Sequence, residues 1–152
     1  MTRVLWIAIA GVALVGAALI STGKLGAEDS GSILSPYDSA IVDRGAAVYQ
    51  ANCASCHEIN IEGQANWRQR DADGRLPAPP HDASGHTWHH DGETLFQLTK
   101  YGVGALINDP EYASNMPIYE GVLSDDEIIA VLSFIKSTWP EEIRARHDEM
   151  EN

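Results

Sequence analysis

Two cysteines and a histidine form the strongest chemical signal in the chain. Cys53 and Cys56 are separated by two residues, and His57 follows directly. Two thiols one helical turn apart can form thioethers with the two vinyl groups of a porphyrin, while the adjacent imidazole reaches the iron from the same side. C-x-x-C-H is typical of the attachment site of a c-type haem. The pattern therefore predicts one covalently attached haem c on Cys53 and Cys56, with His57 as an iron ligand.

Other uses of a C-x-x-C pair fit the sequence less well. Such a pair can be a dithiol redox centre or half of a zinc site. A zinc site would need a second cysteine pair, and the chain has only two cysteines. A thioredoxin-like centre would need a βαβ context, whereas this motif follows a helical pattern. The two cysteines also exclude a disulfide framework.

Haem iron needs a second axial ligand or a vacancy, and Met116 is the leading candidate. It lies in an irregular segment far downstream and precedes Pro117, which would stiffen the loop that presents the sulfur. Met1 belongs to the apolar leader and Met150 to a charged tail. A lone methionine usually fills a gap in the core, but the haem motif upstream favours a ligand. We expect His57 and Met116 to bind the iron.

A histidine-rich segment, residues 81–90, offers further metal ligands. Imidazole is the commonest side-chain ligand of metals. One of these histidines could replace Met116 on the iron, or the group could bind copper or zinc by itself. A glycine within the segment and a helix that starts only after it count against a closed metal site. We favour exposed or propionate-bonding histidines at the rim of a haem crevice. The four residues are His81, His86, His89 and His90.

Three helices are expected to position these groups. The first begins at residue 38 or 39 and runs into the cysteine motif, with apolar or small residues every three or four positions. A short second helix follows a cap at Asp91 and ends at Gly102. The third begins at Ser124, where the capping box reaches Glu127, and stops before Pro140. Together they predict a small all-α domain around one haem.

A long irregular segment, residues 58–90, separates the cysteine motif from the second helix. Such a segment in a compact domain is normally a functional loop or one wrapped around a ligand. We interpret it as the wall over one edge of the haem. Trp67, Arg75 and Trp88 carry donors that could reach the haem propionates, and Trp88 is the preferred candidate.

Both ends of the chain differ from this domain in composition. Residues 4–20 are an uninterrupted apolar run, which predicts a membrane anchor or, as the alternative, a cleaved signal within residues 1–22. Residues 23–37 are expected to form a flexible linker, residues 38–140 the domain, and residues 141–152 a charged, solvated tail. Either leader would export the domain, with Arg3 kept in the cytoplasm. We therefore expect a bacterial inner-membrane protein with a periplasmic domain, or a soluble periplasmic one.

The order of helix, CASCH, long loop, short helix, Met-Pro loop and final helix resembles a class I mono-haem c-type cytochrome over residues 39–139. The resemblance implies the cytochrome c fold, with His57 as the proximal ligand and Met116 as the distal one. It implies that the carbonyl of Pro79 or Pro80 accepts the proximal imidazole N–H, a bond that orients the ring.

The same resemblance implies how the first and last helices meet. Gly45 and Tyr49 match the small and aromatic positions of the first helix, which would cross the last helix against Val131, Leu132 or Ile135.

These features predict an electron carrier rather than an enzyme. Iron with both axial positions filled has no open site for a substrate, and a single haem motif disfavours a peroxidase. The formal charge of −12 argues against nucleic acid and favours redox partners with basic docking surfaces. In a respiratory chain, the protein would connect a quinol-oxidising complex with a terminal oxidase or reductase. The alternatives are a haem-bearing subunit of a periplasmic oxidoreductase complex, or a copper-binding or sensor protein that uses the histidines.

Overall fold

The computed structural model describes residues 31–151 as a helical domain. In chain order the elements are α1 (Ser39–Asn52), α2 (Ala54–His57), the 3₁₀ turn η1 (Thr87–His89), α3 (Gly92–Leu106), α4 (Asp125–Ser137) and α5 (Glu141–Met150). No strand occurs among these described residues, which agrees with the predicted all-α fold. The predicted membrane anchor lies outside the described residues. Within residues 31–151, no helix has the length and apolar character needed to span a bilayer.

The three predicted helix starts are confirmed by their caps. The side chain of Asp38 accepts hydrogen bonds from the backbone N–H of Ala40 and Ile41 at the start of α1. Asp91 does the same for Thr94 in α3. At α4 the Ser124 side chain and Glu127 form the full capping box. Each cap satisfies backbone donors that the first helical turn leaves without a partner.

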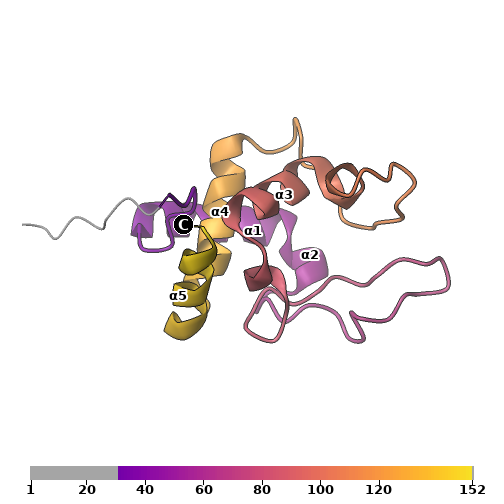
Figure 1. Cartoon of the computed structure of the whole chain (residues 1–152), viewed down its shortest axis with the longest axis horizontal. Helices are drawn as coiled ribbons and strands as arrows, with labels where there is room; N and C mark the ends of the chain where they lie inside the picture. Colours follow the sequence, from indigo (N-terminus) through magenta and orange to yellow (C-terminus); the bar gives the residue numbers. More distant parts are fainter. Residues whose placement is uncertain (1–30, 152) are drawn as a thin grey trace, which may run out of the picture.

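Helices α1 and α4 cross at a glycine, and they form the centre of the fold (Figure 1). A Cβ atom on Gly45 would overlap the backbone carbonyl of Ala130 and crowd Phe134. The ring of Tyr49 lies 5.5 Å from that of Phe134. The face of α4 that meets these two α1 residues therefore carries Ala130 and Phe134. The expected partners Val131, Leu132 and Ile135 belong to the same buried core as Tyr49.

Helix α3 does not stop where the sequence predicts. Gly102 has φ 82° and ψ 163°, so the helix breaks there, but another turn follows and reaches Leu106. A residue with a side chain rarely adopts this positive φ. Gly102 is therefore a kink within α3 rather than its end.

The prediction of a solvated tail is wrong, because Glu141–Met150 forms helix α5 and packs on the domain. The ring of His147 is fully buried. The Lys136 ammonium, also fully buried, lies 2.6 Å from Asp148 and 3.5 Å from Glu151. The tail contains few apolar residues, so hydropathy gives no sign of this docking. Paired charges from two helices hold it instead.

The end of the predicted linker also packs on the domain. Leu34 is buried in the core, and the backbone N–H of Ser35 donates to Ser133 Oγ at 2.9 Å. Residues 31–37 are therefore not a free tether in the structure. They lie beside the C-terminal end of the chain (Figure 1), where Gly92 N–H donates to Glu151.

Removing Lys136 should destabilise the protein strongly. In Lys136→Ala the Glu151 carboxylate, whose side chain is 4% exposed, loses its cation. Breaking a buried ion pair from one side typically costs about 3–5 kcal/mol. We expect a loss of this size in the free energy of unfolding, measured by denaturant titration of the holoprotein.

Lys100→Ala is the matched control for this substitution. Its ion pair with Asp125 is equally short at 2.6 Å, but the Asp125 side chain is 60% exposed. Solvent screens a pair with an exposed partner, so the loss of stability should be much smaller than in Lys136→Ala. Equal losses in the free energy of unfolding of Lys136→Ala and Lys100→Ala would contradict the conclusion that the buried charges hold α5 on the domain.

Candidate functional site

The cysteine motif lies in a short helical turn that α1 positions. Cys53 follows the last residue of α1, and Ala54–His57 forms α2. The Tyr49 hydroxyl donates to the carbonyl of Glu58 at 2.9 Å and lies 3.3 Å from that of His57. Tyr49 thus links the α1–α4 crossing to the end of the motif. Cys53 is partly buried and Cys56 exposed, and both thiols are free.

One ring nitrogen of His57 is already committed to a hydrogen bond. Nδ1 lies 2.8 Å from the carbonyl oxygen of Pro79. A carbonyl can only accept, so Nδ1 carries the proton and Nε2 keeps its lone pair. Burial lowers the pKa of His57, and the bond to Pro79 offsets this in part. The ring is therefore prepared to bind a metal through Nε2.

Of the two candidate prolines, Pro79 is the one whose carbonyl meets the His57 ring. The carbonyl of Pro80 instead lies 3.5 Å from the Thr87 hydroxyl. The sequence could not separate the two, because the choice depends on how the long loop returns to α2.

A short set of backbone hydrogen bonds brings Pro79 to His57. Gln64 N–H donates to Ala78, and His81 N–H donates to Ile61, each at 2.8 Å. Gly63 lies between these two bonds, has φ 66°, and would overlap the backbone of Pro79 if it carried a Cβ. The two segments of the loop, around Gly63 and around Pro79, can approach this closely because residue 63 has no side chain.

Met116 is partly buried and packs against the same apolar core as Cys53. Its backbone N–H donates to Ser114 Oγ at 3.0 Å. The neighbouring Asn115 accepts a hydrogen bond of 2.9 Å from the Arg75 guanidinium. Arg75, one of the three candidate propionate donors, therefore joins the long loop to the Met116 loop.

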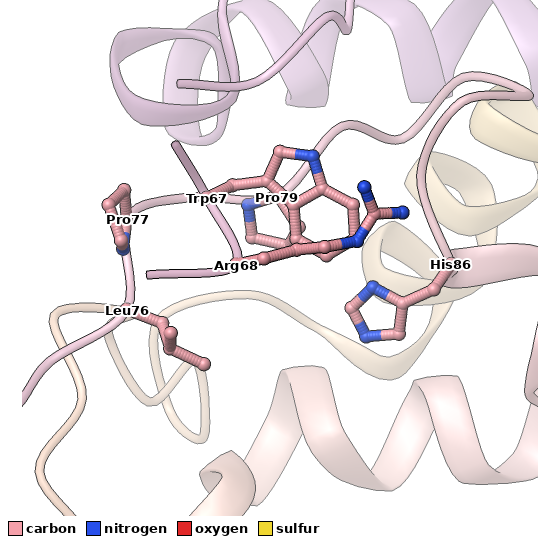
Figure 2. A pocket seen from close by; sticks show the side chains of 6 residues that line it. All are labelled: Trp67, Arg68, Leu76, Pro77, Pro79 and His86. Atoms are coloured by element: carbon pink, nitrogen blue, oxygen red, sulfur yellow. The ribbon is translucent and has the colours of Figure 1, made fainter. Parts of the chain in front are cut away.

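The long loop lines an open pocket of about 430 Å³ (Figure 2). The Arg68 guanidinium lies 4.0 Å from the centre of the Trp67 ring, and His86 stacks on the same indole at 5.3 Å. Pro79 belongs to the wall, so the pocket adjoins His57. The lining residues are Trp67, Arg68, Leu76, Pro77, Pro79 and His86. Sequence reasoning missed Arg68, although its position beside Trp67 was a signal for a cationic and aromatic wall.

Trp88, the preferred propionate donor, has another partner. Its indole N–H donates to the carbonyl of Ala83 at 3.3 Å. The ring stacks on His89 at 3.7 Å and lies under the Arg146 guanidinium from α5. Trp88 therefore anchors η1 to α5 and does not line the pocket.

The four clustered histidines point to different places. His81 stacks on His57, His86 on Trp67 and His89 on Trp88, and His90 meets the edge of His86. The structure does not bring them together around one ion.

A different group of residues has ligand atoms close enough to share a metal ion. It is the only such group found among the described residues, and it consists of His147, Asp148 and Glu151. The ammonium of Lys136 already lies between its two carboxylates. This cluster is therefore a buried ion-pair network.

Residues 42–139, well over half of the chain, match the family model of cytochrome c. The chain therefore belongs to the cytochrome c family. Its helical fold and single C-x-x-C-H motif make it a class I c-type cytochrome, which carries covalently attached haem c and has a haem-based role in electron transfer. No curated protein and no solved structure shows significant similarity to the chain.

The residues present fit a haem group. Cys53 and Cys56 are unpaired thiols one helical turn apart, as two thioether bonds require. His57 follows them with Nδ1 fixed and Nε2 free. Burial raises the pKa of Cys53 to about 11, so this thiol stays protonated at neutral pH until it reacts.

Replacing both cysteines should abolish covalent haem attachment. In Cys53→Ala/Cys56→Ala no thiol remains to form a thioether, so we expect no haem on the protein after denaturing electrophoresis. Ser55→Ala, between the two cysteines, is the control and should retain the haem stain. A stain that persists in the double variant would exclude attachment at this motif.

Proposed function

We propose that this cytochrome is a one-electron carrier whose iron is ligated by His57 and Met116. The observation that carries the proposal is the 2.8 Å contact between His57 Nδ1 and the Pro79 carbonyl. This contact fixes the Nδ1 side of the imidazole and leaves Nε2 to bind the iron, directly after the two cysteines of the haem motif. The proposed site of action is the periplasmic face of a bacterial inner membrane.

The bound haem supplies a one-electron Fe(III)/Fe(II) couple. If His57 and Met116 both bind the iron, they would leave it no position for a substrate, and the group would supply electron transfer alone. A thioether ligand favours the ferrous state and raises the reduction potential. The protein therefore acts as an electron carrier in this proposal and not as an enzyme.

The loop contacts of Met116 support its role as the distal ligand. Arg75 and Asn115 connect this loop to the long loop, and Ser114 accepts the Met116 N–H. Pro117 further restricts the backbone next to the sulfur. A ligand loop restrained in this way loses less conformational entropy when the sulfur binds iron.

Trp67 and Arg68 are better placed than Trp88 to meet the haem carboxylates. Both line the pocket beside Pro79, and the Arg68 guanidinium adds a positive charge there. Charge-assisted hydrogen bonds from arginine to carboxylate are among the stronger polar contacts in proteins. We therefore transfer the propionate role from Trp88 to these two residues.

The formal charge of −12 supports brief docking onto basic partners. Together with the apolar residues 4–20, it supports a place in a respiratory chain between a quinol-oxidising complex and a terminal oxidase or reductase. An acidic carrier would be steered to basic surfaces on both.

Met116→Ala should remove the thioether ligand. We expect loss of the weak sulfur-to-iron charge-transfer band of the ferric protein and a lower reduction potential, because the sulfur no longer stabilises Fe(II). Visible spectroscopy and potentiometric titration measure the two effects.

Met150→Ala is the matched methionine control. Met150 lies at the end of α5 and is 45% exposed, so its loss should change neither the band nor the potential. If the band survives in Met116→Ala, Met116 is not the distal ligand.

The charge of the protein should set the salt dependence of its reactions. We expect oxidation of the reduced protein by a cationic cobalt complex to slow as ionic strength rises. Oxidation by an anionic iron complex should accelerate, because salt then screens a repulsion. Stopped-flow kinetics over a salt series measure both. The same salt dependence for the two oxidants would argue against electrostatic steering.

A further inference from the structure

His81 occupies an unusual position against the proximal ligand. Its ring stacks on His57 with a centroid separation of 4.0 Å and an interplanar angle of 20°. Pro79 precedes His81 by two residues, and its carbonyl accepts the hydrogen bond from His57 Nδ1 at the edge of the imidazole. One loop segment thus contacts His57 both at its edge and on its face.

The His81 ring is itself fixed in place. Its Nδ1 lies 2.9 Å from Thr87 Oγ1, and that hydroxyl lies 3.5 Å from the Pro80 carbonyl. Since the Thr87 hydroxyl can donate to Pro80, it can accept the N–H of His81. The edge of the Tyr49 ring lies against the imidazole, with centroids 6.3 Å apart and planes at 74°.

The backbone of His81 is held from two other directions. Its N–H donates to Ile61 at 2.8 Å, and its carbonyl accepts the indole N–H of Trp139 at 2.7 Å. Trp139 is buried at the end of α4, where the Arg144 guanidinium of α5 also bonds the Trp139 carbonyl. The stacked ring is therefore anchored to the C-terminal helices.

A histidine is a costly choice if this position only needs to be filled. Burying a polar ring requires a hydrogen-bond partner, whereas an aliphatic side chain of similar size requires none. A planar ring at position 81 also restricts the rotation of the His57 ring, which an aliphatic side chain would not do. Two stacked rings stay close to parallel, so rotation of His57 about its Cβ–Cγ bond is opposed.

We propose that His81 is a positioning residue that sets the plane of the His57 imidazole and, through it, the electronic state of the haem iron. The hydrogen bond to Pro79 fixes which nitrogen faces the iron, and the stacked ring of His81 fixes the rotation of the ligand plane. This inference rests on the ligation by His57 proposed above.

The test compares His81→Leu and His81→Phe as ferric holoproteins. The order of the four haem methyl shifts in the proton NMR spectrum depends on the orientations of both axial ligands, so rotation of the imidazole alone changes it. We expect His81→Leu to change this order and to shift the reduction potential. His81→Phe, which keeps a planar face, should return both toward the wild-type values. His89→Leu, in the same loop but stacked on Trp88, is the control and should change neither.

Thr87→Val provides a second route that leaves His81 in the chain. It removes the hydroxyl that holds the His81 ring while keeping the shape of the side chain. We expect the four haem methyl shifts to take the same altered order as in His81→Leu. This variant decides the matter if His81→Leu does not accumulate in a folded form.

The outcomes separate this inference from the proposed ligation. A wild-type spectrum without signals from an axial imidazole and an axial methionine would overturn the ligation itself. A wild-type spectrum that shows both, with the wild-type methyl order and potential retained in His81→Leu or in Thr87→Val, would overturn the positioning role alone. A lower melting temperature with an unchanged spectrum would likewise assign His81 a structural role only.

Discussion

The hydrogen bond between His57 and Pro79 is the constraint on which the rest of the site depends. An imidazole that binds a metal through one nitrogen is oriented by what the other nitrogen bonds. The two residues are 22 positions apart in the chain. The loop between them must therefore leave α2 and return to the same ring, and it lines an open pocket on the way. It does so where Gly63 and Gly85 have no Cβ to collide with the Pro79–Pro80 backbone.

The C-terminal part of the chain stabilises this return. Trp139 bonds the carbonyl of His81, and α5 packs on η1 through the contact between Arg146 and Trp88. A buried cation, Lys136, ties α5 to α4. The proximal face of the site thus depends on residues that follow the cysteine motif by some 80 positions or more, which no local pattern in the motif reveals.

The parts of the structure that the sequence predicted correctly are governed by local chemistry. The C-x-x-C-H motif and the caps at Asp38, Asp91 and Ser124 each act within a few residues, so spacing alone identifies them. The features that spacing alone does not determine depend on contacts between distant segments. Pro79 and Pro80 are equivalent until the loop path is known, and helix α5 is held by paired charges that a hydropathy pattern cannot detect.

Residues 31–35 lie close to Glu151, so the two ends of the described chain lie on one side of the molecule. Ser35 bonds Ser133, and Glu151 bonds Gly92, so both ends of the described chain meet beside α4 and α5. The long loop and the Met116 loop extend at the opposite side (Figure 1). A fluorescent label or a surface tether joined to residue 31 or residue 151 would therefore lie away from these two loops. The described domain could be immobilised on an electrode through residue 151, with the two loops turned to the solution.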